Sequence, residues 1–318
     1  MIHFLRLIRP INLLIIAVTM YSVGGYLDIV YAEFNDGIML IRSFNFFLLV
    51  ISTVFIAAAG NIINDYFDVR ADRINRPERT IIITHIKRRW AIVFHWVLNF
   101  IAFAIAIHLG LVLETFWYVF IHLLSINLLW FYSMQLKRTL VVGNVVIALL
   151  TALVPVLVGI YYQDFYRGVT LETAHPFHLN SYQFFPIYLG IGLGIFAFVL
   201  NLTREIVKDM EDVKGDLVLK ARTIPIVYGL EKSRSIAVFF VFVTMALSIP
   251  IFWFWQTGAI DGIALVPLFL SALSAIFSLV ILLLPINDRN LKTADLGLKL
   301  TIVFGMTLPL FWVFQLMQ

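Results

Sequence analysis

The sequence of 318 residues contains no cysteine, and only 13% of its residues are charged. The absence of cysteine excludes disulfides, thiolate metal sites and cysteine nucleophiles. A soluble domain carries about a quarter charged residues, so this chain has too little polar surface to cover a water-soluble globule. Apolar residues make up 61% of the sequence. The composition therefore indicates an integral membrane protein.

The few charged residues are unevenly spaced, and nine long runs lack Asp, Glu, Lys and Arg altogether. Each run approaches or exceeds the roughly 20 residues that cross a bilayer core. A membrane β-barrel would show short alternating segments instead. We therefore predict an all-α bundle of nine transmembrane helices that forms a single domain over residues 1–318. The charge-free runs are 10–27, 43–64, 90–113, 115–136, 139–163, 173–203, 235–260, 262–287 and 300–318.

Positive charge falls almost entirely on one side of this predicted bundle. Nine crossings put the two termini on opposite sides, and all but two of the 23 Lys and Arg residues fall on the N-terminal side. The two exceptions are Arg42 and Arg167. Because cytoplasmic loops carry the excess of Lys and Arg, we expect a cytoplasmic N-terminus and an outer C-terminus in the cell membrane. This asymmetry accounts for the net charge of +4 without a nucleic-acid partner.

Two segments on the basic side repeat each other after the second and the sixth predicted helix. Each carries three aspartates spaced i, i+3, i+7, and an Arg-Thr-Ile follows each set at nearly the same offset. These helices cross in the same direction, so the repeat indicates two similar halves whose acidic sets face each other. The aspartates are Asp65, Asp68 and Asp72 in the first segment and Asp209, Asp212 and Asp216 in the second.

This acidic spacing predicts a metal site. Residues at i, i+3 and i+7 share one face of a helix, where three carboxylates repel each other. Mg²⁺ removes that repulsion, since it binds one or two carboxylates and completes its shell with phosphate oxygens. The interleaved Arg and Lys residues can contact the remaining phosphate oxygens. Solvated loops with positive-inside charge would explain the basic residues but not two matched acidic triplets among only 19 acids.

At these residues the chain resembles the UbiA superfamily of intramembrane prenyltransferases. The family's motif Asn-Asp-x-x-Asp-x-x-x-Asp matches residues 64–72, and its second motif, an Asp-x-x-x-Asp usually preceded by Lys-Asp, matches residues 208–216. Arg9-Pro10-x-Asn12 is similar to the family's entry to the first helix. The polar stretch from Tyr132 to Asn144 is similar to its third polar site. The resemblance extends over the whole chain.

The resemblance implies a reaction. A prenyl diphosphate binds head-first through Mg²⁺ to both acidic sets, and its chain lies in the bundle or against membrane lipids. The diphosphate leaves, an allylic cation develops, and a lipophilic acceptor captures this cation. The implied metal ligands are Asn64, Asp65, Asp68, Asp72, Asp209, Asp212 and Asp216. The implied catalytic residues are Asp68, Asp72, Asp212, Asp216 and Lys137. The implied substrate-binding residues are Arg9, Asn12, Asn61, Arg76, Arg79, Tyr132, Lys208 and Arg222.

The sequence indicates the identity of the acceptor less clearly than it indicates the reaction. Residues 74–79 and 204–209 are most similar to the digeranylgeranylglyceryl phosphate synthases, which implies geranylgeranylglyceryl phosphate as acceptor. An aromatic ring of quinone biosynthesis and a tetrapyrrole are the alternative acceptors. The basic run 87–89 would serve either an acceptor phosphate or lipid headgroups. A transporter is the rival class, but transporter sites usually lie at the bilayer midplane, whereas these acids follow charge-free helices.

Overall fold

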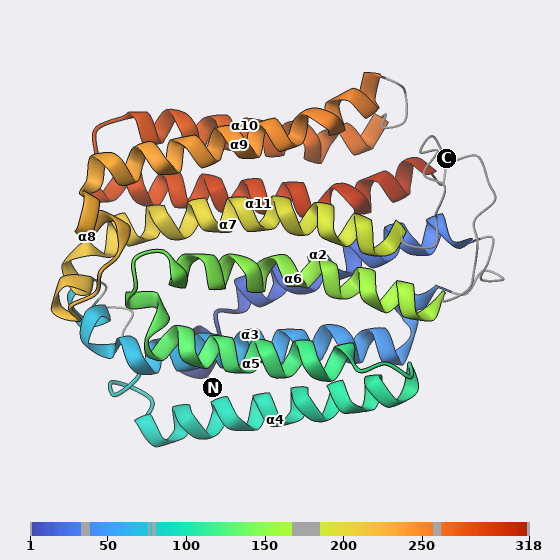
Figure 1. Ribbon diagram of the computed structural model, residues 1–318, viewed down its shortest axis with the longest axis horizontal. Coiled ribbons are helices and arrows are strands. Elements are labelled where there is room, and N and C mark those ends of the chain that lie inside the picture. Colours follow the sequence, from blue (N-terminus) through green and yellow to red (C-terminus); the bar gives the residue numbers. More distant parts are fainter. Residues whose placement is uncertain are drawn as a thin grey trace.

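The computed structural model describes residues 2–32, 39–75, 77, 81–166, 185–256 and 262–316. Within these ranges nine helices are long and apolar enough to cross a membrane, which confirms the predicted number. Figure 1 shows them lying roughly alongside one another in a bundle. They are α2 (Pro10–Val30), α3 (Phe44–Asn75), α4 (Arg88–Val112), α5 (Trp117–Met134), α6 (Val142–Phe165), α7 (Phe185–Val218), α9 (Leu230–Gln256), α10 (Leu265–Leu283) and α11 (Asp288–Leu316).

Short helical elements join or precede the long ones. The N-terminal helix α1 runs into α2 across a bend at Arg9, and α8 joins α7 to α9. A single 3-10 turn precedes each of α3, α6 and α10. These short elements are α1 (Ile2–Ile8), α8 (Ile224–Tyr228), η2 (Leu40–Arg42), η4 (Leu136–Arg138) and η6 (Gly262–Ala264).

Three helices extend beyond the charge-free runs that predicted them. The helix α3 continues to Asn75 and α7 continues to Val218, so both acidic repeats are helical and not loops. The helix α11 begins at Asp288, so Lys299 lies within it and not in a preceding loop. A helix satisfies its own backbone hydrogen bonds in lipid and in water, so it need not end where its apolar run ends.

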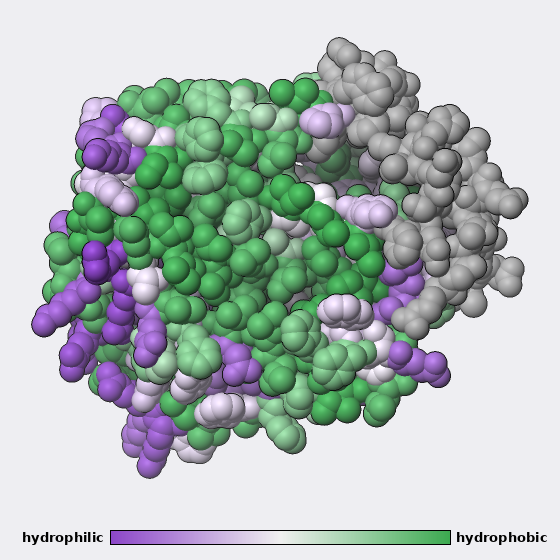
Figure 2. Space-filling view, viewed as in Figure 1, coloured by the Kyte–Doolittle hydropathy of each residue, from purple (hydrophilic) through white to green (hydrophobic). Residues whose placement is uncertain are grey.

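The outside of the bundle is apolar. Phe100 and Leu111 of α4 are each 75% exposed, and large apolar side chains cover most of the face seen in Figure 2. In water this surface would be unfavourable, but lipid tails solvate it. Polar residues gather instead along the edge of Figure 2 that holds the ends of α3 and α7.

The packing of α6 on α7 relies on small residues. A Cβ at Gly159 would lie 2.4 Å from the Pro186 carbonyl oxygen, and one at Gly190 would lie 2.8 Å from that of Pro155. Small residues allow helix backbones to approach closely where no hydrophobic force drives helices together in lipid. This contact fixes the position of α7, which carries the second acidic set.

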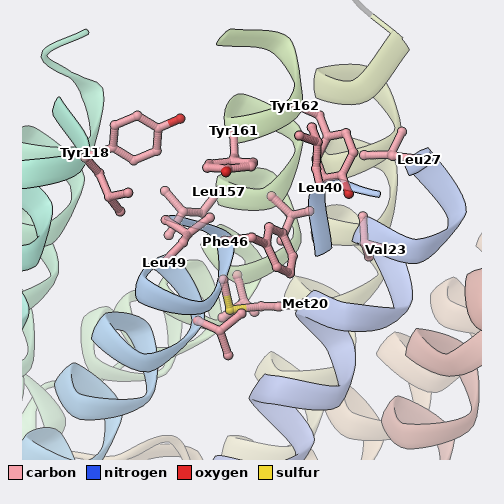
Figure 3. Close-up of a cluster of buried hydrophobic side chains, with 14 of the residues drawn as sticks. Met20, Val23, Leu27, Leu40, Phe46, Leu49, Tyr118, Leu157, Tyr161 and Tyr162 are labelled. Atoms are coloured by element: carbon pink, nitrogen blue, oxygen red, sulfur yellow. The ribbon is translucent and has the colours of Figure 1, made fainter. Parts of the chain in front are cut away.

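Among the described residues, the largest cluster of buried apolar side chains lies at the opposite end from the acidic sets. Its side chains come from the second halves of α2 and α6, the starts of α3 and α5 and the end of α4, and several are tyrosines. Figure 3 shows Phe46 between the α2 and α6 side chains, with Tyr161 and Tyr162 beside it. The two ends of the bundle therefore differ, because one is packed with rings and the other carries the charged motifs.

Candidate active site

Asn75, the last residue of α3, ties the two acidic sets together. Its Nδ2 donates to the Asp212 carbonyl oxygen over 3.0 Å, and its Oδ1 accepts from the Gly215 amide over 2.8 Å. A Cβ at Gly215 would lie 2.4 Å from the Asn75 Nδ2, so only glycine leaves room for this contact. The ends of α3 and α7 therefore meet directly, as the internal repeat predicted.

The first acidic set meets a cation from α2. The Arg9 Nη2 lies 2.6 Å from the Asp65 Oδ1. Arg9 has a φ of 57°, in the left-handed region that a non-glycine residue adopts at a cost of about 1–2 kcal/mol. Asn61 of α3 holds this bend, since its Nδ2 donates to the Ile8 carbonyl oxygen over 2.9 Å. The strained bend directs the guanidinium toward α3.

A second cation reaches the same set from η4. Lys137 forms an ion pair with Asp68, and its Nζ donates to the Asn64 Oδ1 over 3.3 Å. Burial and the nearby cations Lys208 and Arg138 lower the pKa of Lys137 to about 7. Such crowding of positive charge in a buried position favours an anion between these cations.

The second acidic set lies among an amide, a tyrosine and a lysine–glutamate ion pair. The Asn144 Nδ2 of α6 donates to the Asp209 Oδ2 over 2.8 Å. Lys208 lies 3.6 Å from Glu205, which is itself buried. Tyr132 of α5 lies within electrostatic range of both Glu205 and Asp209. Polar residues of α5, α6 and α7 thus lie close to one another near the second acidic set.

The remaining predicted substrate residues divide into three groups. Asn12 lies one turn after Arg9, and its Oδ1 accepts from the Lys299 Nζ over 2.7 Å. Arg222 is exposed, and its backbone amide donates to the Arg138 carbonyl oxygen. Arg76 and Arg79 lie outside the described residues. The partly buried acids Asp72, Asp212 and Asp216 stay with their sets at the ends of α3 and α7.

The donor chemistry of this site suits magnesium. The two sets offer carboxylate and amide oxygens, which are the hard ligands that Mg²⁺ binds. In the part of the chain that is described, no three acidic, histidine or cysteine side chains already converge on one point as metal ligands. Several acids instead contact Arg9, Lys137 or Asn144. A bound metal ion would replace Arg9, Lys137 or Asn144 as the partner of these acids.

A family profile covers most of the chain. The model of the UbiA prenyltransferase family matches residues 37–294, a stretch that includes both acidic sets and the polar residues of η4 and α6. This chain belongs to the UbiA prenyltransferase family. It is therefore an enzyme, a membrane prenyltransferase, and the transporter alternative is excluded.

Individual relatives in the UbiA family are similar over most of their length. Digeranylgeranylglyceryl phosphate synthase of Pyrococcus horikoshii is 36% identical over 246 residues, which cover 77% of this chain and 76% of the relative. The enzyme of the same name from Methanothermobacter thermautotrophicus is 30% identical and covers 90% of this chain and 86% of its own.

Solved structures share the fold. A digeranylgeranylglyceryl phosphate synthase structure superposes with a TM-score of 0.62 at 24% identity, covering 99% of this chain and 97% of that one. A UbiA homologue from Archaeoglobus fulgidus, solved with GPP and Mg²⁺ bound, gives a TM-score of 0.55 at 17% identity. It covers 96% of this chain and 99% of its own. These likenesses establish the UbiA fold of the bundle.

Sequence reasoning missed several polar residues of this site. The pairing of Asn75 with α7 was not predicted, nor was the network that joins Arg204 to Asp295 over 2.8 Å and Lys299 to Asn12. One signal was present, because Asp295 and Lys299 stand four residues apart like a helical ion pair. The charge-free run began after both residues, so they were assigned to a loop.

Proposed function

We propose that this enzyme transfers a geranylgeranyl group from geranylgeranyl diphosphate to the free hydroxyl of geranylgeranylglyceryl phosphate, with Mg²⁺ as cofactor. The observation that carries the proposal is the Asn75 contact, which brings two acidic sets from opposite halves to one place. The names of the relatives that are 30–36% identical support the choice of acceptor. We further propose that all 318 residues form one domain.

The donor headgroup lies between the two acidic sets in this proposal. Asn64 and the six aspartates form the set from which Mg²⁺ would draw its protein ligands, and the bound metal would neutralise the charge that develops on the leaving diphosphate. The GPP and Mg²⁺ of the A. fulgidus homologue support this assignment. The residues that would serve as metal ligands are Asn64, Asp65, Asp68, Asp72, Asp209, Asp212 and Asp216.

The cations around the acids have a second part in this mechanism. Arg9, Lys137 and Lys208 each contact an acid now, and each can donate to a diphosphate oxygen. Donors fixed around a leaving group favour its departure, because they need little reorganisation as its charge grows. Asn61 positions Arg9 by holding the bend before α2. Tyr132 would contact substrate from α5.

The orientation of the bundle follows from its charge. We propose that the end with the acidic sets faces the cytoplasm, with the N-terminus inside and the C-terminus outside, because nearly all Lys and Arg residues fall on that side. Reporter fusions after Asn75 and after Val218 should report a cytoplasmic position, and a fusion at the C-terminus should report the outside. A cytoplasmic C-terminus would contradict the proposed orientation.

A competition assay tests the acceptor. Purified enzyme receives geranylgeranyl diphosphate, Mg²⁺ and an equimolar mixture of geranylgeranylglyceryl phosphate, hydroxybenzoate and dihydroxynaphthoate. We expect the glyceryl ether phosphate to be the alkylated acceptor, with release of one diphosphate per product. An aromatic product alone would overturn the acceptor and leave the prenyltransferase reaction intact.

A further inference from the structure

Lys299 is a cation without an acidic partner among the described contacts. It lies half-buried in α11, and its Nζ donates to the neutral amide oxygen of Asn12 over 2.7 Å. Its natural helical partner is Asp295, one turn earlier. The Arg204 Nε of α7 instead forms an ion pair with Asp295, at 2.8 Å from its Oδ1. The Lys299 ammonium has three donors, and the Asn12 contact uses one of them.

The surroundings of Lys299 carry a surplus of positive charge. Within the described ion pairs, Arg9 pairs with Asp65, Arg204 pairs with Asp295 and Glu205, and Lys208 shares Glu205. Arg204, Asp295 and Arg9 all lie within electrostatic range of Lys299, so Asp295 is shared between Arg204 and Lys299. Four cations thus share three acids, and Asp65 is a proposed metal ligand. A partly buried cation is costly unless an anion compensates it.

Lys299 and its neighbours lie beside the proposed donor site. Asn12 lies one turn past Arg9, which contacts the first acidic set, and Arg204 lies one turn before Lys208 and Asp209. The helix α11 packs against both α2 and α7 and brings Lys299 between them. Lys137 and Asn144 contact the acidic sets from η4 and α6. Arg9 and Lys208 are assigned to the donor diphosphate, so Lys299, Asn12 and Arg204 are the groups that offer a second anion position.

We propose that Lys299, together with Asn12 and Arg204, binds the phosphate monoester of the acceptor. The inference rests on the proposed function, since it assigns a place to the phosphate of geranylgeranylglyceryl phosphate. A phosphate monoester carries close to two negative charges at neutral pH, which the surplus cation and the shared Arg204 can balance. The basic run 87–89, the alternative position for an acceptor phosphate, is exposed.

A purely structural role is the competing explanation, in which Lys299 and Asn12 only tie α11 to α2. Lys299→Met removes the charge and keeps most of the side-chain volume. We expect a rise of roughly ten- to hundredfold in the KM for geranylgeranylglyceryl phosphate, since charge-assisted hydrogen bonds of this kind are lost. The KM for geranylgeranyl diphosphate should stay within about twofold. Lys292→Met is the matched control, because Lys292 is exposed on the same helix.

Geranylgeranylglycerol, the same acceptor without its phosphate, gives the decisive comparison. If wild type turns it over, Lys299→Met should leave its KM unchanged; if wild type does not, the phosphate itself is required, as proposed. A rise in donor KM equal to that for the acceptor, an equal rise with the neutral acceptor, or no rise would each overturn the inference. Failure of wild type to alkylate geranylgeranylglyceryl phosphate would instead overturn the proposed function.

Asn12→Asp separates binding from folding. An aspartate gives Lys299 an acidic partner, so it preserves or strengthens the tie between α2 and α11 while it repels a phosphate. We expect acceptor KM to rise by roughly tenfold with an unchanged thermal midpoint. An unchanged acceptor KM in this variant would mean that Lys299 only joins the two helices, and the inference would fall.

Discussion

Two ends of the same bundle hold aspartates in different ways. At the end opposite the motifs, Asp28 of α2 is buried and accepts from the Leu40 amide over 2.9 Å, the Ile41 amide over 3.0 Å and the Tyr162 hydroxyl over 2.8 Å. These donors are two backbone groups and one fixed hydroxyl. At the motif end, Asp65 and Asp68 contact Arg9 and Lys137, long cationic side chains from other elements.

The difference shows what separates a structural acid from a candidate ligand. The donors around Asp28 belong to η2 and α6, so this carboxylate joins the loop before α3 to the bundle, and a ligand would have to break that joint. The cations at the motif end can turn to a phosphate when a metal takes their carboxylates. A membrane-embedded acid is therefore not by itself evidence for a reaction. Whether it is structural or a candidate ligand depends on how freely its partners can turn away and on their charge.

Removal of magnesium should have the largest effect on turnover and should affect only the motif end of the bundle. Excess chelator should abolish turnover, since Mg²⁺ is the proposed link between the acidic sets and the diphosphate, and added Mg²⁺ should restore it. Thermal unfolding in chelator should leave the Asp28 end intact, as that end needs no metal. Full turnover in excess chelator would contradict the proposed mechanism.

Replacement of one motif acid should have the next largest effect. Asp68→Asn and Asp212→Asn keep side-chain shape but remove a charge, and each should lower kcat by roughly a thousandfold or more because the metal loses a ligand. Single-turnover and steady-state assays measure this. Glu231→Gln is the control, since Glu231 is an exposed acid in the first turn of α9. If kcat falls no further than in the control variant, these acids take no part in the mechanism.

Separation of α3 from α7 should have an intermediate effect. Gly215→Ala places a methyl group 2.4 Å from the Asn75 Nδ2, so Asn75 must move and the acidic sets lose their alignment. We expect kcat/KM to fall by roughly tenfold, which corresponds to about 1.4 kcal/mol. Gly192→Ala is the matched control on the same helix, because a Cβ there meets nothing within 4 Å. Equal activity of the two variants would show that the Asn75 contact does not align the site.

Change at Asp28 should have the smallest effect on turnover. Asp28→Asn sets an amide against a backbone donor, which should lower the free energy of unfolding by about 1–3 kcal/mol. We expect kcat and both KM values to stay within about twofold of wild type. Thermal unfolding of the detergent-solubilised protein and steady-state kinetics measure the two quantities. A large loss of kcat without loss of stability would assign Asp28 a part in the reaction and erase the contrast between the ends.

The sequence alone predicted much of this enzyme. Nine helices, the apolar exterior and the acidic spacing at i, i+3, i+7 are local properties, because each depends on residues within one helix of the chain. The resemblance to the UbiA family could be stated from the same short motifs. The limits of α3, α7 and α11 could not, since a run of apolar residues marks the bilayer and not the end of a helix.

The partners of the acids were decided only by tertiary structure. Arg9 reaches Asp65 across 56 positions, Asn144 reaches Asp209 across 65, and Lys299 reaches Asn12 across 287. No spacing rule relates residues so far apart, because helix packing brings them together through side-chain shape over the whole bundle. The sequence thus determined which chemical groups are present and which predicted helix each one is near. The packing of the helices determined which acids meet cations, which acids meet amides, and that Lys299 donates to the amide of Asn12.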